Sequence, residues 1–291
     1  MFWSFKFQHF VRGLILAVVT AIFAVTAPAF TQTLQVTPTN PQLGDTLSVL
    51  IQESMSSSTP TVIMDGKTYP FFSIGQNKSR ALLPTTPLDP PGKRQLQITT
   101  GAGVQNISIN LQNRSFPTQS IWLSSEKDSI EGTDLEFDRV AAFKQLVSPE
   151  KFWNGPFIRP NQGPVSTVYG VRRYYNGEFA EDYYHRGVDY ADDNGSPVVA
   201  PAAGRVALVG LESQGFELHG NTVGIDHGQG VTSIFIHLSR INVKEGDFVQ
   251  SGQLIGGVGS TGASTGPHLH WGLYVHGQSV DPVLWRYQGV E

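Results

Sequence analysis

The sequence predicts a mainly β protein, in which a targeting segment precedes two strand-rich parts. Charged residues make up 15% of the 291 residues, against about a quarter in a typical soluble chain. The 31 glycines and 18 prolines mark many turns. Short runs of alternating apolar and polar residues lie between these turns, a period typical of half-buried strands. This length suggests two domains, or one domain with appendages.

Net charge and cysteine content exclude several classes of protein. The net charge is −4, whereas a nucleic-acid binder normally shows a basic excess. The chain has no cysteine, which excludes disulfides, iron–sulfur clusters, thiolate zinc sites and a cysteine nucleophile. A metal site must therefore be built from carboxylates and from the 8 histidines.

Residues 1–29 have the three-part pattern of a secretory signal peptide. Lys6 and Arg12 precede an apolar stretch from Leu14 to Val25, and Ala27-Pro28-Ala29 offers small residues at a cleavage site. We expect an exported protein of the periplasm or cell envelope of a bacterium, with no membrane association after signal cleavage. An uncleaved inner-membrane anchor is the alternative, and the absence of cysteine excludes a lipoprotein.

Residues 30–120 are expected to form a small β-sandwich, for which an immunoglobulin-like arrangement is one model. Thr46–Ile51 alternates with period two, and Thr61–Phe72 is a hairpin around Asp65-Gly66. A second hairpin is expected over Gln95–Leu111. With no histidine here, a spacer or adhesion module is the simplest interpretation, and docking onto the downstream domain or binding of wall polymer is the alternative.

Residues 121–164 are expected to be a linker with one helix at about 134–147. Thr133 can cap the first turn of this helix, and Glu136 can reach back to complete a capping box. Ser148-Pro149 ends the helical pattern, and Trp153–Pro164 is rich in Pro, Gly and Asn.

The last part, residues 165–291, contains most of the histidines. A hairpin around Asn176-Gly177 is expected to lead to His185 and Asp189, which share a face at positions i and i+4 in a helix or in a strand. Further on, His237 lies in the run Ser233–Leu238. Strand alternation predicts that its imidazole points away from the apolar face of Ile234, Ile236 and Leu238.

A glycine-rich run, Gly259–Pro267, leads into His268 and His270, which point to one side of a strand while Leu269 points to the other. Several imidazoles without partners would be costly to bury, so the cluster predicts a metal site. Two imidazoles and one carboxylate suit Zn²⁺ with an open fourth position. The spacing alone does not say which of His268 and His270 binds the metal.

These motifs closely resemble the LytM/lysostaphin-type M23 zinc metallopeptidases, over about Tyr169 to Trp285. The resemblance rests on His185-x-x-x-Asp189, on His237 in an apolar strand, and on His268-x-His270 after a Thr-Gly-x-x-x-Gly-Pro run. It implies an antiparallel β-sheet domain with an open groove and one Zn²⁺ per chain. It also implies that His185, Asp189 and His270 hold the metal, while His237 and His268 act on the catalytic water and the tetrahedral intermediate. Many members carry an acidic residue two positions after the last histidine, where this chain has Gly272 after Trp271.

The resemblance implies a zinc endopeptidase that cuts peptide cross-links of bacterial peptidoglycan. A wall-binding regulator that activates another hydrolase is the alternative, although none of the five key positions is lost. A third hypothesis is self-inhibition, in which Val147–Pro164 or the β-module covers the groove. The sequence does not separate a D-alanyl–diaminopimelate bond from a glycine bridge as the substrate. A monomer is assumed.

The remaining histidines are interpreted as incidental. His227 and His276 are expected in turns, and His219 is expected in a solvated loop, with a contact to substrate at the rim of the site as the alternative.

Four residues near His185 are interpreted as structural. Arg172 and Arg173 are expected on a solvated hairpin face, with groove contacts to wall carboxylates as the alternative. Tyr183 and Tyr184 are interpreted as strand aromatics, and a hydroxyl that stabilises an oxyanion is the alternative.

Overall fold

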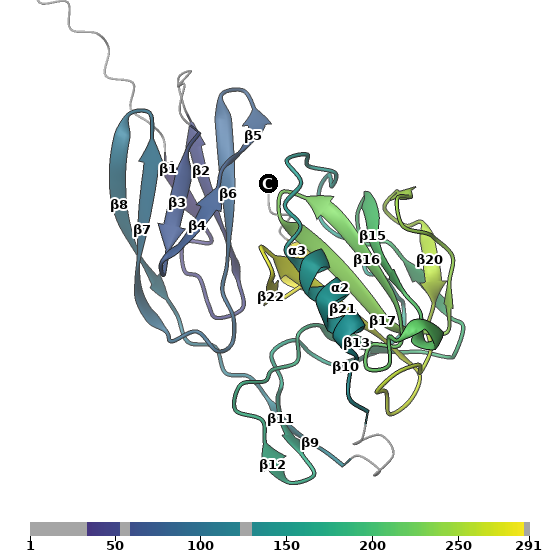
Figure 1. Ribbon diagram of the computed structural model, residues 1–291. Coiled ribbons are helices and arrows are strands. Elements are labelled where there is room, and N and C mark those ends of the chain that lie inside the picture. The colour runs from purple at the N-terminus through teal and green to yellow at the C-terminus, as the bar shows by residue number, and fades with distance from the viewer. Residues whose placement is uncertain (1–33, 53–58, 123–129, 288–291) are drawn as a thin grey trace, which may run out of the picture. The chain divides into compact units, whose positions relative to one another are not determined.

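The computed structural model describes residues 34–52, 59–122 and 130–287. The expected signal segment, residues 1–29, lies outside these described residues. Within the described ranges, no helix has the length and apolar character needed to cross a membrane. The protein is mainly β and its sheets are built almost entirely from antiparallel pairs, which confirms the predicted fold class (Figure 1).

The first part of the described chain consists of two four-stranded sheets that share one apolar core. Leu47, Val49 and Ile51 enter this core from one sheet, and Val62 and Leu96 enter it from the other. The expected β-sandwich is therefore present, and its immunoglobulin-like character stays a prediction. The first sheet contains β1 (Leu34–Thr37), β2 (Thr46–Gln52), β6 (Lys78–Pro84) and β5 (Phe72–Gly75), and the second contains β4 (Lys67–Pro70), β3 (Thr61–Met64), β7 (Gly92–Thr100) and β8 (Gly103–Leu111).

Both hairpins expected in this part are confirmed. β3 pairs with β4 across Asp65-Gly66, and the φ angles of these residues are 51° and 76°. Two consecutive left-handed residues are what a tight two-residue hairpin turn needs. β7 pairs with β8 along its whole length.

The predicted linker helix is α2 (Asp134–Lys144), which ends three residues before the expected boundary. Thr133 caps it by accepting the backbone N–H of Glu136 at 3.1 Å. Val140 and Phe143 of α2 pack with Leu208, Ile234 and other residues of the downstream part in one apolar cluster. The helix is therefore packed onto the downstream sheet rather than suspended between two domains.

A three-stranded sheet precedes the histidine motifs. It consists of β12 (Glu178–Phe179), β11 (Arg172–Tyr175) and β9 (Thr118–Ile121), and β9 pairs with β11 in parallel. The predicted hairpin around Asn176-Gly177 is β11–β12, shorter than expected. The strand β9, which spans the expected boundary between residues 30–120 and the linker, thus extends this hairpin.

An eight-stranded sheet carries the histidine motifs. Its central strands β13, β21 and β17 are neighbours, and Val188, Leu269 and Phe235 on them are fully buried in the largest apolar core. The sheet contains β10 (Val165–Thr167), β13 (Val188–Ala191), β21 (His268–Val275), β17 (Val231–Leu238), β16 (Asn221–Gly228), β15 (Gly204–Gly210) and β19 (Phe248–Val249), with β22 (Gln278–Val280) paired to β21. A smaller sheet contains β14 (Pro197–Val199), β20 (Leu254–Gly257) and β18 (Arg240–Ile241), and short helices lie at η1 (Glu212–Gln214) and α3 (Leu284–Tyr287).

Candidate metal centre and groove

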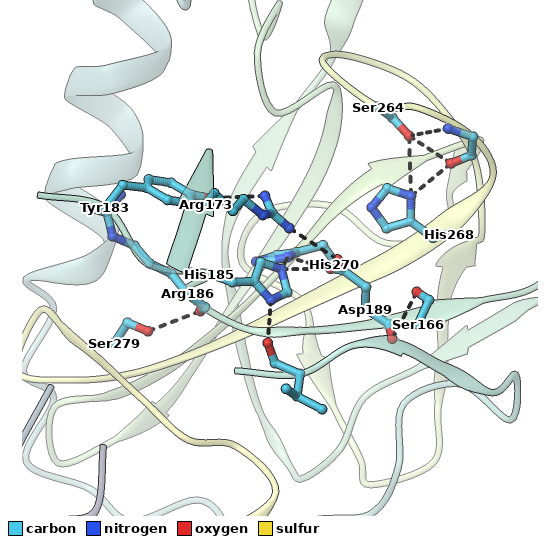
Figure 2. A network of polar contacts seen from close by, with 12 residues as sticks. Ser166, Arg173, Tyr183, His185, Arg186, Asp189, Ser264, His268, His270 and Ser279 are labelled. Atoms are coloured by element: carbon cyan, nitrogen blue, oxygen red, sulfur yellow. Dashed lines mark hydrogen bonds and ion pairs between the residues drawn. The ribbon is translucent and has the colours of Figure 1, made fainter. Parts of the chain in front are cut away.

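Three side chains converge on one point of the large sheet, as Figure 2 shows. The distances are 3.0 Å from His185 Nε2 to Asp189 Oδ1, 2.8 Å from His270 Nδ1 to the same oxygen, and 3.0 Å between the two nitrogens. All three residues are largely buried. The structure thus brings together the three residues that the family resemblance names as metal ligands.

Strand register places two of these residues opposite each other. In the antiparallel pair β13–β21, Asp189 faces His270 directly, so their side chains project from the same face of the sheet. His185 lies in the loop before β13 and not in a helix or a strand. A helix over His185–Asp189 is wrong, and of these two residues only Asp189 lies in a strand, although the two side chains do project together.

Gly187 allows the loop with His185 to approach β21. A Cβ atom at this position would lie 2.3 Å from the carbonyl oxygen of Trp271 and 2.8 Å from Cε1 of His270. Any side chain here would push the loop away from the strand that carries His270. The loop can therefore lie this close to β21 only because residue 187 has no side chain.

The hydrogen bonds of His185 indicate a cation site. Its Nδ1 lies 2.9 Å from the carbonyl oxygen of Val168; because a carbonyl only accepts, Nδ1 carries the proton. In the neutral ring, the Nε2 lone pair then points at Asp189 Oδ1 and His270 Nδ1. A proton or a metal cation must lie between these atoms to stabilise the cluster.

The spacing of the three atoms fits zinc. Three ligand atoms 2.0–2.1 Å from one tetrahedral ion lie roughly 3.3 Å from each other, close to the observed edges of 2.8–3.0 Å. Burial raises the pKa of Asp189, but His185 and His270 outweigh this effect and hold it well below its ordinary value. Burial lowers the pKa of His270 to about 4. The protein therefore offers an anionic carboxylate and a neutral His270 imidazole, the states that bind metal.

A left-handed backbone angle turns the side chain of His237 toward the groove that holds the metal-centre residues. Its φ angle is 63°, a left-handed value that is rare for a residue with a Cβ atom. Its backbone N–H donates to the carbonyl of His219 at 2.9 Å, outside the ladder of β17. His237 consequently lines the same groove as Ile234 and Ile236, so the expectation that it points away from these two residues was wrong.

Two imidazoles beside the metal centre are held with Nε2 open. His237 Nδ1 donates to the carbonyl of Thr261 at 2.8 Å, and His268 Nδ1 donates to that of Gly266 at 2.8 Å. Their ring centroids are 5.0 Å apart. Burial, with His268 and His270 nearby, lowers the pKa of His237 to about 3. Its open nitrogen is therefore an acceptor near neutral pH.

These five residues line one groove of about 620 Å³. Its walls include Gln119 at the end of residues 30–120, Ile121 and Ile130 of the linker, and Leu218 and Tyr274. Among the described residues, the lining contains no member of Val147–Pro164, and Gln119 is its one member from residues 30–120. The lining therefore gives no support to Val147–Pro164 as the covering segment of the self-inhibition hypothesis.

The sequence profile described as peptidase family M23 matches residues 183–282. This range contains all five residues that converge in the groove. Residues 183–282 are an M23 peptidase domain.

Relatives with this domain are longer than the present chain. The DD-carboxypeptidase/endopeptidase Mpg of Neisseria meningitidis is 46% identical over 99 residues, which cover 34% of this chain and 22% of Mpg. The peptidoglycan DD-endopeptidase ShyA of Vibrio cholerae is 41% identical over 97 residues, which cover 33% of this chain and 22% of ShyA. The chain thus matches less than a quarter of the length of these two relatives.

One solved structure is similar over most of the chain. It is the crystal structure of a candidate M23 peptidase from Pseudomonas aeruginosa, with 26% identity and a TM-score of 0.63. The match covers 87% of this chain and 97% of that one. The shared arrangement therefore extends well beyond the M23 domain.

Glu136 of α2 binds the M23 domain in a way that the sequence did not reveal. Glu136 of α2 is fully buried and accepts the backbone N–H groups of Leu218 and His219 at 3.0 and 2.6 Å. It also accepts from Nδ1 of His219. Burial raises the pKa of Glu136, but the hydrogen bonds from His219 and Leu218 keep it below its ordinary value. The expected return of Glu136 to the helix start was wrong, because the turn before β16 offers three donors.

Two of the incidental histidines also differ from expectation. His227 lies in β16, where it is fully buried, and its ring nitrogens lie 2.9 Å from the carbonyl of Ala203 and from Ser233 Oγ. His219 lies in a turn as expected, but it is bound to Glu136 instead of being solvated, and its place in the groove lining agrees with the alternative of a rim contact. His276 does lie in the turn between β21 and β22.

Arg173 and Tyr183 face the groove, whereas Arg172 and Tyr184 are not in its lining. Arg173 is 13% exposed and donates from Nη1 to the hydroxyl of Tyr183 at 3.2 Å. The solvated hairpin face expected for Arg173 was therefore wrong. Tyr184 is buried, with its ring against Tyr169.

Gly272 leaves little room for the acidic residue common at this position of the family. A Cβ atom there would lie 3.0 Å from Ile234 Cγ2 and 3.1 Å from the carbonyl oxygen of Arg186. Trp271 before it is buried and donates from Nε1 to Ser233 Oγ at 3.2 Å. In this M23 domain the departure is accommodated by local packing.

Proposed function

We propose that the protein is a zinc-dependent endopeptidase that hydrolyses peptide cross-links of bacterial peptidoglycan. The observation that carries this proposal is the convergence of His185 Nε2, Asp189 Oδ1 and His270 Nδ1 within 3.0 Å of one another at the base of a groove. The names of the relatives Mpg and ShyA, which describe a DD-carboxypeptidase/endopeptidase and a peptidoglycan DD-endopeptidase, support the substrate class.

His185, Asp189 and His270 would hold one Zn²⁺. Zinc bound there supplies a Lewis acid for the scissile carbonyl and lowers the pKa of water toward neutrality. The carbonyl of Val168 fixes the tautomer and orientation of His185, as outer partners of metal-bound histidines commonly do.

His268 and His237 would handle protons. Each has Nδ1 held by a carbonyl and Nε2 open, so Nε2 can accept a proton from the attacking water. A protonated His268 can then donate a hydrogen bond to the oxyanion or a proton to the departing amine, whereas the lowered pKa of His237 favours a role in accepting from the attacking water. Ser264, 3.3 Å from His268 Nδ1, helps to fix the orientation of that ring.

The remaining sequence predictions complete the proposal. The protein is exported to the cell envelope by residues 1–29 and acts there as a monomer. Residues 30–120 form a β-module, 121–164 a linker and 165–291 the peptidase domain. Most of the groove lining comes from 165–291, and Ile121, Ile130 and Lys144 of the linker and Gln119 of the β-module add to it.

Metal analysis with an activity assay tests the proposal. Purified protein should contain one zinc per chain and should solubilise purified sacculi. A chelator should abolish this activity, and added zinc should restore it. His270→Ala should lose both the metal and the activity. Bound zinc without hydrolysis, together with activation of a separate wall hydrolase, would instead identify a regulator.

A further inference from the structure

The side chains that line the groove have an unusual charge balance. Apart from the metal-centre residue Asp189, the described lining contains no acidic side chain, but it contains three cationic ones, Lys144, Arg173 and Arg186. The chain as a whole has a net charge of −4. The groove is therefore locally cationic on an acidic protein, as expected of a site that takes an anionic ligand.

Arg173 is the cation closest to the metal centre. Its Nη2 lies 3.9 Å from Asp189 Oδ2, an ion pair too long for a hydrogen bond. Figure 2 shows this guanidinium beside Asp189 and His270, on the side of Tyr183. An anion bound by Arg173 would thus lie next to the bond that is presented to the metal centre.

The guanidinium also has unused hydrogen-bonding capacity. Nη1 donates to the hydroxyls of Tyr175 and Tyr183, both at 3.2 Å. Within the described residues, Nη2 makes no hydrogen bond, since its ion pair with Asp189 Oδ2 is 3.9 Å long. A carboxylate is the group that the planar guanidinium fork binds best. Tyr175 and Tyr183 meanwhile hold the guanidinium in place.

The possible substrates differ in the charge carried by the carbon next to the scissile nitrogen. In a D-alanyl–diaminopimelate cross-link, the carbon attached to the scissile nitrogen carries a carboxylate. The same carbon carries a carboxylate in a terminal D-alanyl-D-alanine. An internal bond of a glycine bridge has no charged group there. The acyl side of the first two bonds is alanyl, whose methyl group offers nothing to a cation.

We propose that Arg173 is a specificity-determining residue that binds the carboxylate on the carbon next to the scissile nitrogen. This proposal rests on the proposed function and deepens it, since it selects D,D-linked acidic peptides over neutral glycine bridges. Lys144 and Arg186 provide further positive charge for other carboxylates of the stem peptide.

Two matched peptides test this assignment. One is diacetyl-L-lysyl-D-alanyl-D-alanine with its terminal carboxylate, and the other is the same peptide with a terminal carboxamide. Zinc-loaded full-length protein should cleave the acid with a kcat/KM roughly tenfold to a hundredfold higher, the range of one charge-assisted hydrogen-bonded contact. Arg173→Met should abolish this preference, and Arg173→Lys should keep part of it.

Arg172→Met is the matched control. It removes a positive charge from the adjacent position of β11, but Arg172 donates to the backbone carbonyl of Tyr183 and is absent from the groove lining. The ratio of kcat/KM for the acid peptide to kcat/KM for the amide peptide should be unchanged in this variant, even if its melting temperature falls. Because a ratio is measured, a partial loss of folded protein does not affect the readout.

Each outcome decides one question. If the wild type shows no acid preference, or if Arg173→Met keeps it, the assignment of Arg173 is wrong while hydrolysis of both peptides still supports the peptidase. If Arg173→Met slows both peptides equally and loses zinc, Arg173 only positions Asp189. If neither peptide is cleaved, calorimetry on the zinc-loaded His268→Ala variant decides: tighter binding of the acid supports the role of Arg173, and equal binding refutes it.

Discussion

Glu136 accepts the backbone N–H of His219 at 2.6 Å, and the carbonyl of His219 in turn accepts the backbone N–H of His237 at 2.9 Å. A helix outside the M23 match thereby supports the left-handed residue that carries one of the two proposed proton-handling imidazoles. Phe143 of α2, in the same apolar cluster as Ile234 on β17, strengthens this connection. We expect α2 to be part of the functional unit.

Glu136→Ala should therefore reduce both stability and activity. Loss of the buried carboxylate leaves the N–H groups of Leu218 and His219 without their acceptor, which should cost about 1–3 kcal/mol. The position of His237 should then relax, and kcat should fall more than KM rises. Denaturant unfolding and steady-state kinetics on the acid peptide measure the two effects. Asp138→Asn, which neutralises an exposed carboxylate of the same helix, should leave both unchanged.

A truncated protein that starts near Gly163 should be less active, whereas the self-inhibition hypothesis predicts that it is more active. It lacks α2 and hence the support of the turn at His219. We predict a lower melting temperature and lower activity than in the protein that retains α2. Higher activity of the truncated protein would show that the removed segment inhibits the groove.

His268→Ala and His270→Ala should separate catalysis from metal binding. His268 is not in the three-residue cluster, so its variant should keep one zinc per chain while kcat falls by about 10²–10⁴-fold, the usual contribution of a general acid or base. His270→Ala should lose the metal itself. Metal analysis beside the kinetic assay distinguishes the two variants, and undiminished cleavage by His268→Ala would refute its catalytic role.

Gly187→Ala should lower the affinity for zinc by a steric effect alone. The added Cβ would lie 2.3 Å from the Trp271 carbonyl oxygen, so the loop with His185 must move away from β21. Such overpacking typically costs about 1–3 kcal/mol, and zinc affinity should fall because His185 is displaced. Competition with a fluorescent zinc chelator measures the affinity. An unchanged affinity would mean that the loop is not constrained by β21.

Buried His227 should make stability depend on pH. Burial lowers its pKa in the folded protein to about 4 from the ordinary 6.5, so the unfolded chain binds the proton more readily. The contribution of His227 to the unfolding free energy should thus be constant above about pH 6.5, fall as the pH drops to about 4, and level off below that value. The total loss is on the order of 3 kcal/mol. Urea unfolding at several pH values should show that the free energy of unfolding of His227→Gln varies less with pH than that of the wild type. An equal variation in the two proteins would show that His227 is not the cause.

The sequence was sufficient for local features and for the side chains that regular strands align. Asp65-Gly66 and Asn176-Gly177 specified their turns because the required backbone angles belong to the residues themselves. His268 and His270 share a face because β21 is regular. The predicted metal site followed from this local pattern.

Features that depend on distant partners could not be predicted. Alternation failed at His237, since a left-handed angle redirects its imidazole. The capping pattern at Glu136 predicted a local bond, but three donors from the turn at Leu218 and His219 compete successfully for its carboxylate. Arg173 was expected to be solvated because the sequence gives no sign that β9 pairs with β11 and that Tyr175 and Tyr183 bind its guanidinium.

Mass spectrometry of muropeptides tests the central claim most directly. Purified sacculi are digested with the zinc-loaded protein, and the products are compared with those from the His268→Ala variant. We predict that cross-linked dimers are converted to monomers, each cleavage adding one water and releasing a new amine and a new carboxylate, only with the wild type. An unchanged proportion of dimers, with one zinc bound per chain and His185, Asp189 and His270 intact, would contradict the assignment as a peptidoglycan endopeptidase.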